Sequence, residues 1–153
     1  MYKNRGFSLL ELLIVISIIS IVGAIGTGFY VNYGKNIGIK SVSVAIASDL
    51  KYSQSKSMIG EGGFKWGLHF VNGTLDYYEI FSTPTDYNDG AKVVISKKYL
   101  SDNTSFSDVN IPTTKDIIFN KISGSTTTSN VIIVSASLSK TIDVSSIGNI
   151  SIQ

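Results

Sequence analysis

The sequence predicts an α+β fold, in which one long amino-terminal helix packs on a head built from an antiparallel β-sheet. Two features predict the helix: residues 12–31 form an uncharged apolar run, and residues 39–50 continue it with apolar side chains at steps of three and four. A third feature predicts the sheet, because short segments after residue 63 alternate apolar and polar residues.

Composition limits the classes of function. The chain has 153 residues, which is enough for one domain of ordinary size, and 16% of them are charged. It contains no cysteine, so disulfides, thiol catalysis and zinc–thiolate sites are excluded. The formal net charge is only +2 and Arg5 is the sole arginine. A nearly neutral chain of this kind is a poor candidate for binding a phosphate backbone.

The first element is a basic start followed by the apolar run. The run matches the roughly 20 residues that a helix needs to cross about 30 Å of hydrocarbon, and Lys3 and Arg5 place the amino terminus in the cytoplasm. A secretory signal peptide would be shorter and would end in a small-residue cleavage box. A plain signal anchor explains the length and the orientation, but it leaves Glu11 unexplained.

The helix is predicted to continue past the apolar run, from about residue 8 to about residue 58. Its later part is amphipathic, with one packing face made by Ile39, Val42, Ile46 and Leu50. The polar residues fall mostly elsewhere: Ser41, Ser43, Asp49 and Lys51. Residues 60–63, Gly-Glu-Gly-Gly, end the helix and start a turn.

Strands dominate the rest of the chain. They are expected at 64–70, 75–81, 91–96, 116–122, 130–138, 140–145 and 148–152. Asn72-Gly73 is a strong hairpin signal, and the last two strands are expected to pair through a turn at residues 146–148. Residues 83–90, 100–114 and 123–130 are expected to be loops, the last two exposed.

The segment Gly6-Phe7-Ser8-Leu9-Leu10-Glu11, followed by the apolar run, resembles the processing motif of type IV prepilins and type II secretion pseudopilins. The resemblance implies that a prepilin peptidase cuts after Gly6 and methylates the new amino terminus at Phe7. A carboxylate in hydrocarbon costs about 2.5–3.5 kcal/mol near the bilayer centre. The resemblance assigns Glu11 a partner, the amine of Phe7 on a neighbouring subunit, which makes Glu11 an assembly residue.

This resemblance implies a pilin-like organisation of the chain. Residues 1–6 are the leader peptide, residues 7–31 the transmembrane and filament-core part of the helix, residues 32–59 the amphipathic helix, and residues 60–153 the β-rich head. The head resembles the GspH and FimT-like minor pseudopilins through Trp66-Gly67, Tyr77-Tyr78 and the closing hairpin around Gly148. Some FimT-like members bind DNA through carboxy-terminal arginines. Here Asn149 follows Gly148 and the carboxy-terminal region has no arginine, so DNA is not expected as a partner.

No catalytic constellation is visible in the sequence. His69 is the only histidine and is expected to be a packed or solvated strand residue, not a metal ligand. Asp86 and Asp89 provide too few oxygen ligands for a calcium loop. Neither a nucleophile elbow nor a phosphate-binding loop occurs. The chain is therefore expected to have no catalytic residue, no metal and no cofactor, and not to be an enzyme.

The expected function is that of a structural, minor pilin or pseudopilin subunit of a type IV pilus or type II secretion filament. The alternatives are a major pilin, or a pilus-tip module for DNA uptake or adhesion. The expected partners are the prepilin peptidase, other pilin subunits, an inner-membrane assembly platform and the cytoplasmic membrane. The expected location is that membrane, crossed once with the amino terminus in the cytoplasm, and then an extracellular or periplasmic filament.

Overall fold

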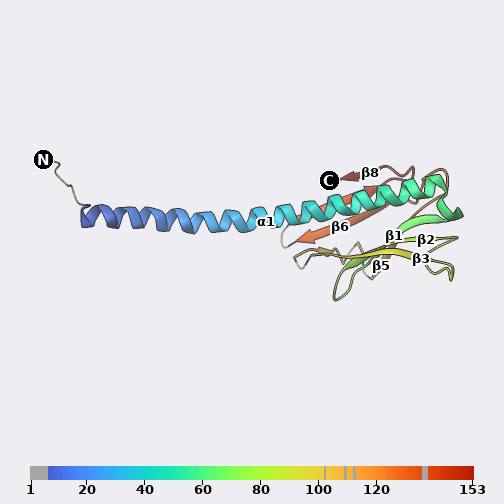
Figure 1. The fold of residues 1–153 in the computed structure, drawn as a ribbon, viewed down its shortest axis with the longest axis horizontal. Coiled ribbons are helices and arrows are strands. Elements are labelled where there is room, and N and C mark those ends of the chain that lie inside the picture. The colour runs from blue at the N-terminus through green and yellow to red at the C-terminus, as the bar shows by residue number, and fades with distance from the viewer. Residues whose placement is uncertain (1–6, 102, 109, 112, 136–137) are drawn as a thin grey trace. The chain divides into compact units, whose positions relative to one another are not determined.

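The computed structural model describes residues 7–101, 103–108, 110–111, 113–135 and 138–153, without the side chains of residues 26–32 and 35. It divides into two compact units, of which the first ends at Lys35 and the second is Asn36–Gln153. Helix α1 is Leu9–Ile59 and is followed by a short 3₁₀ helix, Glu61–Gly63 (Figure 1). The strands are β1 (Lys65–Val71), β2 (Tyr77–Thr83), β3 (Val93–Tyr99), β4 (Ser105–Phe106), β5 (Thr114–Phe119), β6 (Ser129–Ser135), β7 (Leu138–Val144) and β8 (Ile150–Ile152).

Helix α1 has 51 residues and confirms the predicted long helix nearly to the residue at both ends. It stops at Gly60, which has a φ of 72°, a left-handed conformation that costs glycine little. The Gly60 N–H donates to the Ser57 carbonyl over 3.0 Å, and the Gly63 N–H donates to the Gly60 carbonyl over 2.9 Å. These bonds turn the chain from the helix into the first strand.

The described residues of the head form two four-stranded sheets where the sequence predicted one antiparallel sheet. The strand orders are β3-β2-β1-β5 and β4-β6-β7-β8, and every pairing between the described strands is antiparallel. The hairpin at Asn72-Gly73 and the closing β7–β8 pair are confirmed. Strand β4 lies inside the predicted loop 100–114, because two residues are too few to show an alternating pattern.

One hydrophobic core joins the second part of α1 to the inner faces of both sheets, and Figure 1 shows the strands gathered along that part of the helix. Ile39, Ile46 and Leu50 are buried, and Val42 packs against them, as the amphipathic pattern predicted. The first sheet contributes Trp66, Leu68, Phe70, Tyr78, Ile80, Ile117 and Phe119, and the second contributes Phe106, Val131, Ile133, Ile142, Val144 and Ile150.

Polar groups of α1 also face the sheets, which the helical pattern did not predict. Ser43 is fully buried and donates to the Ile39 carbonyl over 2.7 Å. The Asp49 carboxylate accepts from Tyr78 Oη and from Lys98 Nζ, both over 2.7 Å. Burial, and then this carboxylate, raise the pKa of the Tyr78 hydroxyl. Ser43 and Asp49 fit this interface because each has a hydrogen-bond partner there, whereas the buried Ser53 hydroxyl has none among the described residues.

The predicted exposed loop 123–130 is wrong in its middle part. Gly124 and Thr126 are both buried, and Gly124 lies against Gln54 and Met58 at the end of α1. Gln54 Nε2 donates to the carbonyls of Gly124 over 3.1 Å and Gly148 over 2.9 Å. A segment of low apolar content can therefore be held in place by main-chain hydrogen bonds that its composition does not reveal.

Gly67 in β1 lies close to the backbone of β5. A Cβ atom placed there would lie 2.4 Å from the Ile117 carbonyl oxygen and 3.0 Å from the Ile118 Cα. Both neighbours are backbone atoms, so neither can move aside without disturbing the β1–β5 ladder.

We expect Gly67→Ala to lower the free energy of unfolding by about 2–3 kcal/mol or more, because overpacking must displace a strand. Gly73→Ala is the matched control, since a Cβ there meets no atom within 4 Å. Urea unfolding in detergent, followed by Trp66 fluorescence, measures both. Equal stability of the two variants would contradict the close approach.

Candidate functional site

Helix α1 begins directly after the predicted cleavage site. Ser8 precedes the first helical residue; its Oγ accepts from the Leu10 N–H over 3.2 Å, and its carbonyl accepts from the Leu12 N–H over 3.1 Å. Glu11 lies in the first turn, three residues after Ser8. This Ser-x-x-Glu spacing is typical of helix starts, and the helix dipole favours an acid at that end. The motif therefore also defines where the helix begins.

Between Leu9 and Ile25 the described helix carries three polar side chains, and two are satisfied internally. Ser17 Oγ donates to the Leu13 carbonyl and Ser20 Oγ to the Ile16 carbonyl, each over 2.8 Å. Glu11 has no hydrogen bond or ion pair with any residue that the structure describes. Its carboxylate is thus the one side chain in this stretch that requires a partner from outside the described chain.

The apolar side chains around Glu11 are exposed on every face of the helix. Leu9 is 83% exposed, Ile19 65% and Ile25 57%. A helix that is apolar all round is normally covered by other helices or by lipid. Over the described residues, however, no helix combines the length and the apolarity required of a membrane-crossing segment. The membrane span at residues 7–31 therefore stays a prediction.

The three predicted site residues differ in how far the structure describes them. Gly6 lies outside the described residues, as does the whole leader 1–6. Phe7 is 75% exposed and precedes the helix, four residues before Glu11. Sequence reasoning missed Ser17 and Ser20, whose hydroxyls bond back to the preceding turn. The signal was available, because serine inside an apolar helix commonly makes this bond.

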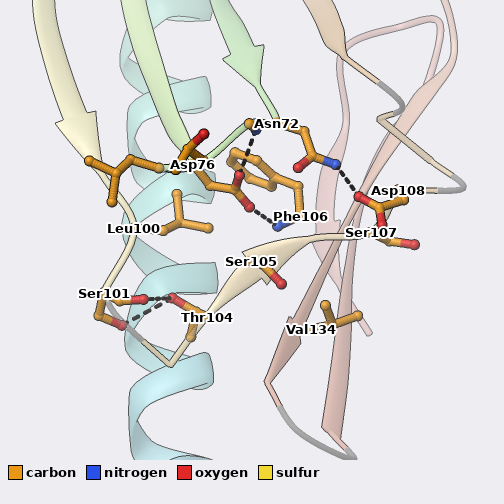
Figure 2. Close-up of a pocket in the computed structure, with 13 residues that line it drawn as sticks. Asn72, Asp76, Leu100, Ser101, Thr104, Ser105, Phe106, Ser107, Asp108 and Val134 are labelled. Carbon is orange, nitrogen blue, oxygen red and sulfur yellow. Dashed lines mark hydrogen bonds between the residues drawn. The ribbon is translucent and has the colours of Figure 1, made fainter.

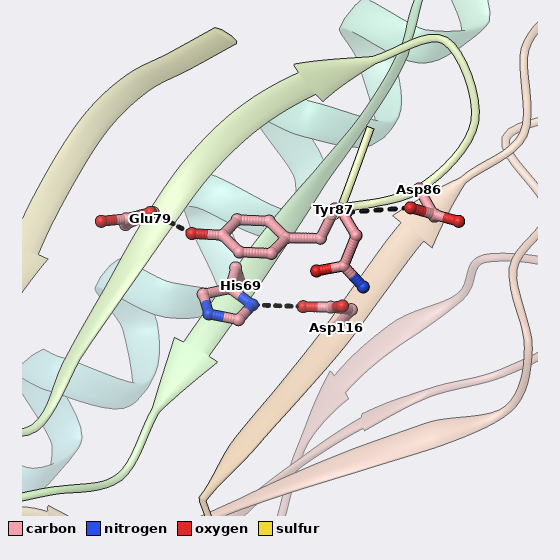
Figure 3. Close-up of polar contacts among 6 residues, drawn as sticks. His69, Glu79, Asp86, Tyr87 and Asp116 are labelled. Atoms are coloured by element: carbon pink, nitrogen blue, oxygen red, sulfur yellow. Dashed lines mark hydrogen bonds and ion pairs between the residues drawn. The ribbon is translucent and has the colours of Figure 1, made fainter. Parts of the chain in front are cut away.

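A second polar arrangement lies on the outer face of the first sheet, around His69 (Figure 3). His69 in β1 has Glu79 in β2 and Asp116 in β5 as direct cross-strand partners. Its Nδ1 contacts Asp116 Oδ1. The Tyr87 ring stacks on the imidazole with centroids 3.5 Å apart, and the Tyr87 hydroxyl donates to Glu79 Oε2 over 2.7 Å. The histidine is therefore packed, which is one of its two predicted states.

Two lysines complete this cluster. Lys97 Nζ lies 3.6 Å from Glu79 Oε1, and Lys92 Nζ lies 3.5 Å from the centre of the Tyr87 ring. Burial, and then the Glu79 carboxylate, raise the pKa of the Tyr87 hydroxyl. Within the described part of the chain, no three histidine, cysteine or acidic side chains are grouped to hold a metal. The contacts hold the loop around Tyr87 onto the sheet.

A cavity of about 580 Å³ lies between the Asn72–Asp76 turn and the segment from Leu100 to Asp108 (Figure 2). The Asp76 carboxylate accepts from the N–H groups of Gly73 over 2.9 Å and Phe106 over 2.7 Å. Asn72 Nδ2 donates to Asp108 Oδ1 over 2.7 Å. These acids are already engaged in holding the turn and β4, so the cavity wall has a structural role.

One family model of known proteins matches the amino-terminal end of the chain. The family model described as the prokaryotic N-terminal methylation motif matches residues 1–27. The match supports a type IV pilin-like protein that is processed by a prepilin peptidase and assembled with other pilin subunits. No curated protein and no solved structure has significant similarity to the chain. The match ends before the head and does not assign a subgroup.

We expect Tyr87→Phe to lower the free energy of unfolding by about 1–2 kcal/mol, since it removes a hydrogen bond to a carboxylate but keeps the ring stack. Tyr33→Phe is the control, because it removes a hydroxyl from an exposed side chain. Urea unfolding in detergent measures both. An unchanged midpoint for Tyr87→Phe would show that its hydroxyl does not hold the loop.

Proposed function

We propose that the chain is a structural, minor subunit of a type IV pilus-like or type II secretion-like filament, cut after Gly6 and methylated at Phe7. The observation that carries the proposal is the Glu11 carboxylate, which has no partner among the described residues and lies in an apolar helix at the end matched by the methylation motif. Its activity is polymerisation.

Cleavage after Gly6 would turn the amide nitrogen of Phe7 into a cationic amine. That amine and Glu11 have opposite charges at the same end of α1. In a low-dielectric environment a lone charge is strongly penalised, whereas an ion pair with further hydrogen bonds is tolerated. We assign Glu11 to the Phe7 amine of a neighbouring subunit, so that each added subunit satisfies a charge that was unpaired before.

The same helix would serve two environments in turn. Before assembly, residues 7–31 would cross the cytoplasmic membrane once, with the amino terminus in the cytoplasm. After assembly they would pack among other helices in the core of an extracellular or periplasmic filament. Apolar side chains on all faces suit both environments, and Ser17 and Ser20 expose no unsatisfied hydroxyl in either one. The remaining partner is an inner-membrane assembly platform.

We expect Gly6→Val to block cleavage, because a branched side chain at the scissile bond hinders the peptidase. Intact mass of protein from membranes, with and without the peptidase, is the measurement. The native chain should lose residues 1–6 and gain one methyl group only when the peptidase is present, and Asn4→Val should behave in the same way. Efficient processing of Gly6→Val would argue against the assigned bond.

We expect Glu11→Ala to be cleaved normally and to be at least about tenfold depleted from sheared filaments, since the amine of a neighbour loses its counter-charge. Glu61→Ala is the matched control, because Glu61 pairs with Lys56 of its own chain. Quantitative immunoblots of membrane and filament fractions give the ratio. Incorporation of Glu11→Ala at the native level would show that Glu11 does not act in assembly.

A further inference from the structure

Lys115 lies where the two sheets meet. It occupies the β5 position two residues before Ile117 and four before Phe119, both core residues, so its side chain is directed to the inner face of the first sheet. Its Nζ donates to the main-chain carbonyl of Asn130, at the start of β6 in the second sheet. The same Nζ is 3.4 Å from Asn130 Oδ1. No acidic side chain among the described residues pairs with this lysine.

The side-chain amide of Asn130 is polarised by a second asparagine. Asn110 Nδ2 donates to Asn130 Oδ1 over 2.7 Å. Asn110 is itself held in place, because its Oδ1 accepts from the Ile132 N–H over 3.3 Å and lies 3.5 Å from Lys115 Nζ. A fixed donor on a carbonyl oxygen stabilises the negative charge that develops when a nucleophile adds to the carbonyl carbon.

The Lys115 amine and the Asp143 carboxylate supply the other two groups that a reaction at the Asn130 amide requires. Burial lowers the pKa of the Lys115 amine, which increases the fraction of the neutral, nucleophilic form. Asp143 in β7 is the direct cross-strand partner of Asn130 in β6, so the two side chains share one face of the sheet. Both line the same cavity of about 410 Å³, which is open to water. A carboxylate therefore lies beside the amide, where it can carry a proton.

We propose that Lys115 and Asn130 form an intramolecular isopeptide bond that links the edge strand of the first sheet to the second sheet. The ammonium of Lys115 first gives a proton, through water, to Asp143, the cross-strand neighbour of Asn130. The bond between Nζ and Cγ of Asn130 then forms, and the bond between Cγ and Nδ2 breaks. Nδ2 leaves as ammonia, with one proton from Nζ, and takes the proton held by Asp143 to become ammonium. No oxidant, metal or cofactor takes part.

The bond would add a covalent connection, besides the loops, between two layers that pack in one core. A cross-link of this kind resists separation of the sheets under load, and that use rests on the proposed filament function. The bond itself does not depend on cleavage after Gly6 or on Glu11. Its presence and the filament function can therefore fail independently of each other.

The test is peptide mapping of the folded, full-length native protein, purified from membranes in detergent and digested with trypsin. We expect a branched product in which residues 99–121, uncut after Lys115, are joined to residues 122–140. Its mass should be lower by about 17 Da, one ammonia, than the sum of the two peptides. Recovery of only linear peptides ending at Lys115 would overturn the proposal, as would a link from Lys115 to Asn110.

Variants separate the chemistry from folding. Lys115→Arg and Asn130→Ala should abolish the branched peptide, whereas Asn149→Ala, which changes another asparagine of the same cavity, should retain it. Asp143→Asn should form the link at least about tenfold more slowly, as expected when a proton carrier is lost. Trp66 fluorescence checks that each variant is folded. A native rate of link formation in Asp143→Asn would show that Asp143 does not carry the proton. A link that persists in Asn130→Ala would overturn the proposed bond between Lys115 and Asn130.

Discussion

The apolar face of α1 between Ile39 and Leu50 is the surface on which the head depends. Both sheets turn their inner faces toward it, and their core side chains form one cluster with the helix. The eight short strands of the described head, in two separate sheets, present much apolar surface, and burying this surface is the main driving force for folding. The helix thus supplies the common layer that lets the two sheets form one domain.

Polar contacts then fix how the helix and the sheets are arranged. Asp49 accepts from Tyr78 and Lys98 of the first sheet, and Gln54 bonds the two loops around Gly124 and Gly148. Burial is not directional, so it favours contact without selecting one register. Hydrogen bonds between partly buried groups do select it, because a shifted arrangement leaves donors and acceptors unpaired.

The described side chains of the first unit, most of them apolar, belong to the same helix from Leu9 onward, but they are exposed. Ser17 and Ser20 bond to their own helix, and Glu11 is the one polar side chain between Leu9 and Ile25 without a partner among the described residues. Such a segment is incomplete as a single chain in water. The methylation motif over residues 1–27 supports a processed and assembled protein, in which other subunits would cover this apolar surface. The head closes its own core, and the amino-terminal end keeps its apolar surface for partners.

The sequence by itself determined the features that depend on neighbouring residues. These include the helix from residue 9 to residue 59, its apolar packing face, its stop at Gly60, most strands, and the motif around Glu11. The tertiary structure alone decided the division into two sheets, the Tyr87–His69 stack, the burial of Gly124 and the meeting of Lys115 with Asn130. Periodicity shows which face of an element is apolar, because that depends on a few adjacent residues. It cannot show which distant groups meet, because that depends on how the whole chain packs.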